Sequence, residues 1–83
     1  MNNKLFVGSL PWAVDDQSLN DLFATYGEVL SARVVTDRDS GRSRGFGFVE
    51  FADDASAQAA IDAMDGADVE GRNITVSVAK PKE

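Results

Sequence analysis

Cysteine and histidine are both absent from this sequence of 83 residues. Their absence excludes a disulfide framework, any zinc site with Cys or His ligands, and a nucleophile–base pair made from these residue types. No apolar run approaches the roughly 18 residues that a membrane-spanning helix needs, and Met1–Lys4 lacks the apolar segment of a signal peptide. We therefore expect a soluble, cytoplasmic protein that binds no metal and no membrane.

Positive charge is also scarce, because 8 Lys and Arg residues stand against 14 Asp and Glu residues, for a net charge of −6. This balance argues against indiscriminate binding of polyanions, but it leaves nucleic acid open because the distribution of charge matters more than its sum. A chain of this length can build one small core. We expect one domain over residues 1–83, with its core at about 4–79 and a short tail at 80–83.

The stretch Arg44–Phe51 reads as a strand whose side chains alternate between two faces. One face carries Phe46, Phe48 and Glu50, and the other carries Gly47, Val49 and Phe51. The carboxylate of Glu50 indicates that its face meets solvent, since an unpaired charge is almost never fully buried. Two exposed aromatic side chains on one rigid strand predict a binding surface.

The first part of the chain predicts a strand and a helix. Lys4–Gly8 alternates as a strand, with Leu5 and Val7 toward the core and Phe6 toward the other face. Asp15 predicts the N-cap of a helix over about 16–25, with Val14 and Leu19 as its hydrophobic staple. Gly27 stands where a left-handed residue is expected to end this helix.

The remaining expected elements follow in the second half of the chain. They are a strand at Glu28–Thr36 with Arg33 outward, a loop at 37–43, the strand described above, a helix from Asp53 or Asp54 to about Met64 that Gly66 ends, a turn at Gly71, and a last strand at Asn73–Ala79 with Ser77 outward. The order βαββαβ predicts an α+β, ferredoxin-like sandwich, with two helices on one face of a four-stranded antiparallel sheet. Its two central strands carry Phe6, Phe46 and Phe48 on the open face.

Two short motifs on these central strands resemble those of the RNA recognition motif family. Arg44–Phe51 matches the signature K/R-G-F/Y-G/A-F-V-x-F/Y at every position, and Leu5–Leu10 resembles the shorter signature. The resemblance covers nearly the whole chain, and it is greatest either to short bacterial, especially cyanobacterial-type, proteins with a single such domain or to a domain of the glycine-rich class. Ser9 departs from the family, which often has Asn there.

This resemblance implies that the open sheet face binds single-stranded RNA, as in a post-transcriptional regulator or RNA chaperone. Carried over by position, Phe6 and Phe48 each stack a base, Phe46 lies against a ribose, and Arg44 pairs with a phosphate. We expect a monomer that needs no cofactor and that binds single-stranded DNA at most weakly.

Further candidate RNA contacts surround this face or follow the last strand: Lys4, Arg33, Arg42, Ser77, Lys80 and Glu50. Glu50 either repels phosphates or accepts a hydrogen bond from a base amino group, and both readings stay open. Acidic residues gather on the expected helices instead, which predicts a basic front and an acidic back.

Other functions of the same fold fit less well. An enzyme of the acylphosphatase kind needs an Arg in the loop after the first strand, and Gly8–Trp12 has none, so we expect no enzymatic activity. The alternative to RNA binding is a protein-interaction module or a self-associating domain. Peptide-binding relatives carry an Arg-x-Phe motif, which Arg72–Ile74 does not match.

Overall fold

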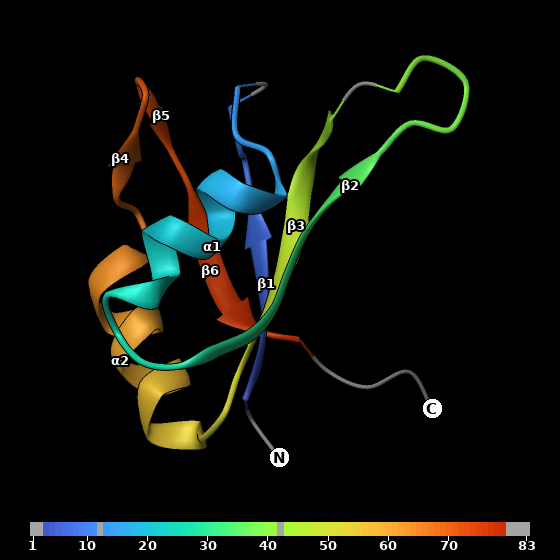
Figure 1. Cartoon of the computed structure of the whole chain (residues 1–83). Helices are drawn as coiled ribbons and strands as arrows, with labels where there is room; N and C mark the ends of the chain where they lie inside the picture. Colours follow the sequence, from blue (N-terminus) through green and yellow to red (C-terminus); the bar gives the residue numbers. More distant parts are fainter. Residues whose placement is uncertain (1–2, 12, 42, 80–83) are drawn as a thin grey trace.

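The computed structural model describes residues 3–11, 13–41 and 43–79, and it has a four-stranded antiparallel sheet with two helices. The elements are β1 (Lys4–Gly8), α1 (Asp16–Ala24), β2 (Val29–Thr36), β3 (Ser43–Phe51), α2 (Asp54–Met64), β4 (Asp68–Val69), β5 (Arg72–Asn73) and β6 (Thr75–Val78). The strand order β2-β3-β1-β6 makes β1 and β3 central. Both helices lie on one side of this sheet, which confirms the ferredoxin-like fold class (Figure 1). Within the described part of the chain, neither helix is long and apolar enough to cross a membrane.

The core lies between the helices and one face of the sheet. Its fully buried large side chains come from both layers: Leu5, Val7, Leu10, Leu19, Phe23, Val49, Phe51 and Ile74. The rings of Phe23 on α1 and Phe51 on β3 lie 6.3 Å apart, centroid to centroid. The inward residues of β1 and β3 are therefore the ones that the alternation predicts, and the opposite phase is left for the open face.

Aspartate side chains begin both helices. Asp15 Oδ1 accepts the Ser18 backbone N–H at 2.8 Å, and Asp53 Oδ1 accepts the Ser56 N–H at 2.7 Å. These backbone hydrogen bonds lower the pKa of both carboxyl groups, because they stabilise the charged form. The predicted cap Asp15 is confirmed, and of the two candidates for the second helix Asp53 is the cap.

Gly27 does not have the left-handed conformation that the sequence predicts. The residues with positive φ include Gly66, which follows α2, but not Gly27. A Cβ at Gly27 would lie 2.1 Å from Ser56 Oγ, at the start of α2. Glycine is thus needed here because the Ser56 side chain of α2 lies too close for any side chain at position 27. This requirement comes from the packing of the two segments, so the local sequence does not show it.

The last strand is shorter than predicted. It begins at Thr75, because Arg72 and Asn73 form β5 and pair with Asp68–Val69 of β4 in a separate hairpin. Ile74 lies between β5 and β6. Its backbone bonds to the residues before β4 instead of to the main sheet, since its N–H donates to Ala67 O at 3.0 Å and its carbonyl accepts Gly66 N–H at 2.7 Å. The predicted turn at Gly71 is therefore the tip of this small hairpin.

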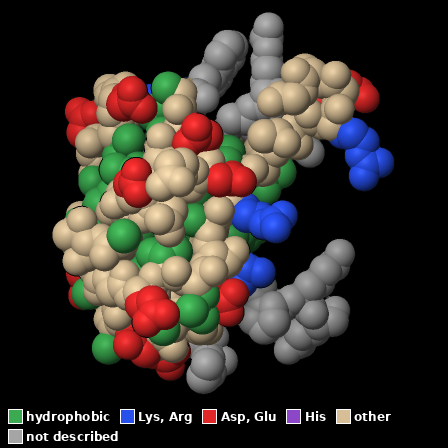
Figure 2. Space-filling view, in the orientation of Figure 1, with side chains coloured by type: hydrophobic (Ala, Val, Ile, Leu, Met, Phe, Trp, Pro, Cys, Tyr) green, Lys and Arg blue, Asp and Glu red, His purple; other side chains and the backbone are tan. Residues whose placement is uncertain are grey.

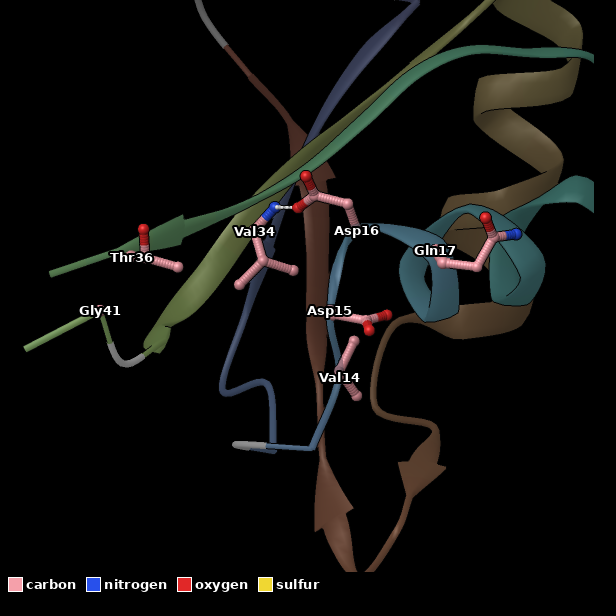
Figure 3. A pocket seen from close by; sticks show the side chains of 7 residues that line it. All are labelled: Val14, Asp15, Asp16, Gln17, Val34, Thr36 and Gly41. Carbon is pink, nitrogen blue, oxygen red and sulfur yellow. Dashed lines mark hydrogen bonds between the residues drawn. The ribbon is translucent and has the colours of Figure 1, made fainter.

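Carboxylates also cover the outer edges of the sheet. Asp16 Oδ1 accepts the Val34 N–H of β2 at 2.7 Å, as Figure 3 shows, and Asp65 Oδ1 accepts the Val76 N–H of β6 at 3.0 Å. Strand β2 also has two register shifts against β3, at Val29/Ser31 and Val34/Thr36, which the sequence did not predict. Occupied backbone groups and bulges both hinder edge-to-edge pairing with another chain.

Candidate nucleic-acid interface

Three phenylalanine rings form one cluster on the open face of the sheet. Phe6 of β1 lies directly opposite Phe48 of β3, and the centroids of these rings are 5.8 Å apart. Phe46 lies 5.7 Å from Phe6 and 6.3 Å from Phe48, with its ring perpendicular to that of Phe48. All three side chains are only partly buried, in contrast to Val49 and Phe51, which follow Phe48 on β3 and point to the core. The aromatic cluster, defined as Phe6, Phe46 and Phe48, is therefore open to a ligand.

Strand register extends this cluster into a row that crosses the whole sheet. Arg33 of β2 is paired with Phe48, Phe48 with Phe6, and Phe6 with Ser77 of β6. Directly opposite residues of an antiparallel pair lie on the same face. Arg33 and Ser77 are both exposed, so the structure brings these two predicted site residues to the two ends of the aromatic row.

A polar row lies next to the aromatic row. Ser31 of β2 is paired with Glu50 of β3, and Glu50 is paired with Lys4 of β1. Lys4 Nζ lies 5.5 Å from the centroid of the Phe48 ring, in a cation–π contact. The predicted residues Lys4 and Glu50 are thus cross-strand neighbours, and Lys4 also contacts the Phe48 ring.

On the other side of the aromatic row, Phe46 is paired with Gly8, and Gly8 with Thr75. A Cβ at Gly8 would lie 2.7 Å from Thr75 Oγ1 and 3.0 Å from a Phe6 ring atom. The missing side chain therefore leaves room for the ring of Phe6.

Two glycines of the longer motif are required by the backbone. Gly45 has a φ of 87°, which side-chain-bearing residues rarely adopt, and its carbonyl accepts the Leu10 N–H at 2.8 Å. A Cβ at Gly47 would lie 2.4 Å from Arg33 O on the neighbouring strand. These glycines hold β3 in the register that presents Phe46 and Phe48.

Three other predicted contacts cannot be placed on this face. Arg42 and Lys80 lie outside the described residues. Arg44 belongs to β3, but its side chain is outside the description as well. Conversely, Ser31 and Thr75 lie on the open face and were not among the predicted site residues. The alternation that places Arg33 and Ser77 outward also places Ser31 and Thr75 there, so the signal was present.

Charge is distributed unevenly over the molecule. Figure 2 shows acidic side chains spread over the side that carries the helices, while most of the Lys and Arg side chains in view lie at the opposite edge. Lys4 and Arg33 of the open face are exposed, and so is Arg38 in the loop between β2 and β3. Of the described cations, Lys4 and Arg33 therefore lie beside the aromatic cluster in spite of the net negative charge.

A hollow of about 370 Å³ lies away from the open face, between the start of α1, strand β2 and the loop that follows β2 (Figure 3). Its two carboxylates are engaged, since Asp15 accepts the N–H of Ser18 and Asp16 that of Val34. Within residues 3–11, 13–41 and 43–79, no group of three His, Cys, Asp or Glu side chains could hold a metal ion. The hollow therefore reflects helix and edge capping, and the open face remains the candidate site.

Comparison with known proteins agrees with these motifs. The family model of the RNA recognition motif matches residues 5–75, so the chain belongs to this family. It is 54% identical over 79 residues to the glycine-rich RNA-binding protein blt801 of Hordeum vulgare, covering 95% of this chain and 49% of that protein. It is also 52% identical over 82 residues to the mitochondrial glycine-rich RNA-binding protein 2 of Arabidopsis thaliana, covering 99% of this chain and 52% of that protein. The chain thus spans about half the length of these curated relatives, and the predicted resemblance to the glycine-rich class is confirmed.

Solved structures show the same fold. The SXL-lethal protein/RNA complex superposes with a TM-score of 0.94 at 32% sequence identity, covering 100% of this chain and 50% of that one. The βαββαβ order and the single helical layer are therefore those of a known family fold. The family is the one that the two motifs predict.

Proposed function

We propose that this domain binds single-stranded RNA by stacking bases on the open face of its sheet. The observation that carries the proposal is the aromatic cluster, three partly exposed rings within 6.3 Å of one another on the two central strands. Unpaired bases stack on such rings, whereas the bases of a duplex are hidden from them. Membership of the RNA recognition motif family and the glycine-rich RNA-binding relatives support the same function over protein interaction.

The proposed roles follow from the place of each residue in the rows. Phe6 and Phe48 stack one base each, and Phe46 lies against the ribose between the two nucleotides. The exposed Lys4 and Arg33 pair with phosphates, and the exposed Ser77 meets a base edge. Arg42, Arg44 and Lys80 are proposed as further phosphate partners from the family resemblance. Base stacking contributes about 1–3 kcal/mol per base, so two stacked bases with a few phosphate contacts give a Kd of roughly micromolar size.

We extend the proposal to the whole chain in the same terms. Residues 1–83 act as one RNA-binding domain that is monomeric, has no enzymatic role and binds single-stranded DNA more weakly than RNA. Its cellular role is that of a post-transcriptional regulator or RNA chaperone. The cytoplasmic location stays a prediction, and one of the relatives named above is mitochondrial.

The test is a fluorescence anisotropy titration with single-stranded RNA from a random pool and with the duplex form of a selected sequence. The wild-type chain should bind the single strand and should bind the duplex much more weakly, because pairing hides the base faces. The triple variant Phe6→Ala, Phe46→Ala, Phe48→Ala is the matched control. Equal affinity of the wild type for both forms, or an unchanged affinity in the triple variant, would contradict stacking.

A further inference from the structure

The polar row offers one carboxylate and one ammonium group side by side at the edge of a stacking ring. Lys4 and Glu50 are direct cross-strand partners, which places their Cβ atoms about 4.5–5.5 Å apart. Glu50 also follows Phe48 by two positions on the same face of β3, a separation of about 6.8 Å along the strand. Glu50 is partly buried and Lys4 is exposed. The two charged groups thus share one border of the Phe48 ring.

The position of the Lys4 ammonium shows how these groups would meet a ligand. Lys4 Nζ lies over the Phe48 ring, 5.5 Å from its centroid, where a stacked base would also lie. A base that stacks on Phe48 therefore displaces the Lys4 ammonium group to the edge of that base. Because the backbone of Lys4 is fixed opposite Glu50, both charged groups then face the edge of the same base.

We propose that Lys4 and Glu50 select guanine for the nucleotide stacked on Phe48, an inference that rests on the proposed RNA binding. A carboxylate has two acceptor oxygens and no donor, and an ammonium has three donors and no acceptor. Guanine presents two adjacent donors, N1–H and N2–H₂, and beside them two adjacent acceptors, O6 and N7. It is the base that occupies both oxygens of Glu50 and also offers two acceptors to Lys4.

The other bases leave part of this pair unsatisfied. Adenine and cytosine each present a single amino group, and uracil presents a single N–H, so one oxygen of Glu50 finds no donor on the base edge. A stacked base shields this oxygen from water. If the base does not replace the lost hydrogen bond, the free energy of binding becomes less favourable. Specificity then comes from the mismatch against three bases as much as from the match to guanine.

The test uses fluorescein-labelled octauridylates that carry a single central guanine, adenine, cytosine, inosine or 7-deazaguanine. The guanine probe should bind the wild-type chain about tenfold more tightly than the adenine, cytosine or all-uridine probes. Inosine lacks the N2 amino group and 7-deazaguanine lacks the N7 acceptor, so each should lose several-fold in affinity.

Two variants divide these losses between the two side chains. In Glu50→Gln, one acceptor becomes a donor, so the difference between guanine and inosine should disappear. In Lys4→Met, the difference between guanine and 7-deazaguanine should disappear, and all probes should bind more weakly because a cation is lost. Asp62→Asn on the exposed side of α2 makes the same charge change as Glu50→Gln and should leave the ranking unchanged. Circular dichroism melting checks that each variant is folded.

The outcomes separate this inference from the proposed function. Equal affinity for all single-substituted probes, with a loss in Phe48→Ala, would overturn guanine selection and leave RNA binding in place. A uniform gain in affinity for every probe in Glu50→Gln would assign Glu50 to the repulsion of phosphates and would also overturn it. Failure of the wild-type chain to bind any probe would contradict both the proposed RNA binding and the selection of guanine.

Discussion

Replacing Phe48 and Phe51 one at a time by alanine should distinguish the open face of β3, which we propose binds RNA, from its core face. Phe51 is fully buried and packs its ring 6.3 Å from that of Phe23. Truncating a buried phenylalanine costs about 3–5 kcal/mol, a large part of the roughly 4–12 kcal/mol that a domain of this size has in total. Phe51→Ala should therefore lower the Tm steeply, by much more than a substitution on the open face.

Phe48→Ala should behave in the opposite way. The partly exposed ring contacts the rings of Phe6 and Phe46 and the ammonium of Lys4, at centroid distances of 5.8, 6.3 and 5.5 Å. Because the ring is partly exposed, each of these contacts contributes at the low end of its range, about 0.5 kcal/mol. The variant should therefore stay folded and lose roughly 1–2 kcal/mol of stability. Its affinity for single-stranded RNA should fall by about 1–3 kcal/mol, or roughly 5- to 150-fold in Kd.

The two measurements are a melting curve by circular dichroism and an anisotropy titration with one single-stranded RNA. The two substitutions lie three positions apart on one strand and remove the same atoms, so each is the control for the other. A drop in Tm for Phe48→Ala as large as that for Phe51→Ala would mean that the faces of β3 are assigned the wrong way round. An unchanged Kd in a folded Phe48→Ala would refute stacking on this ring.

Three further predictions follow from charge and from the turns. The slope of log K against log salt for single-stranded RNA should be shallow, roughly −1.5 to −3, because each phosphate contact contributes about −0.7 and few cations reach the face at once. Titrations at several salt concentrations check this, and a slope steeper than about −5 would contradict it. Glu70→Asn should increase the free energy of unfolding by about 0.5–1 kcal/mol. Glu70 and Gly71 have φ values of 49° and 87° at the tip of the β4–β5 hairpin, where the pair Asn-Gly is preferred. Urea unfolding measures the change. The lowered pKa values of Asp15 and Asp53 stabilise the fold above the ordinary carboxyl pKa of 3.8, and this contribution is lost as the pH falls through the lower folded-state values. The double variant Asp15→Asn, Asp53→Asn keeps capping side chains, so its stability should depend less on pH between about 5 and 2 than that of the wild type.

Much of the fold could be predicted because its signals are local. Period-2 alternation around Phe48 distinguishes the two faces of β3. Each helix begins after an aspartate whose side chain accepts the backbone N–H of the residue three positions later. The bulges of β2 have no such signal. Leu30 lies at the first of them and is 56% exposed, although simple alternation with Val34 would turn it toward the core. The choice depends on how β2 bends along β3, which is a property of the assembled sheet.

The candidate site shows the same division between local and tertiary information. The motifs Leu5–Leu10 and Arg44–Phe51 indicate which side chains face outward on each strand. They do not indicate which residue of one strand lies opposite which residue of the other. The pairing of Lys4 with Glu50, and the contact of Lys4 with Phe48, require the register between segments more than forty residues apart.

The acidity of the chain has a structural explanation that reconciles it with binding a polyanion. At least six of the 14 acidic side chains accept hydrogen bonds from backbone N–H groups, at helix starts, sheet edges and turns: Asp15, Asp16, Asp37, Asp53, Asp65 and Asp68. None of these six lies in β1 or β3, whose outward side chains form the aromatic cluster. On the open face of those two strands the one carboxylate, that of Glu50, stands opposite the ammonium-bearing Lys4. These six carboxylates therefore stabilise backbone groups away from the open face. An RNA strand that approached the aromatic cluster would meet the local balance of charge there rather than the sum of −6.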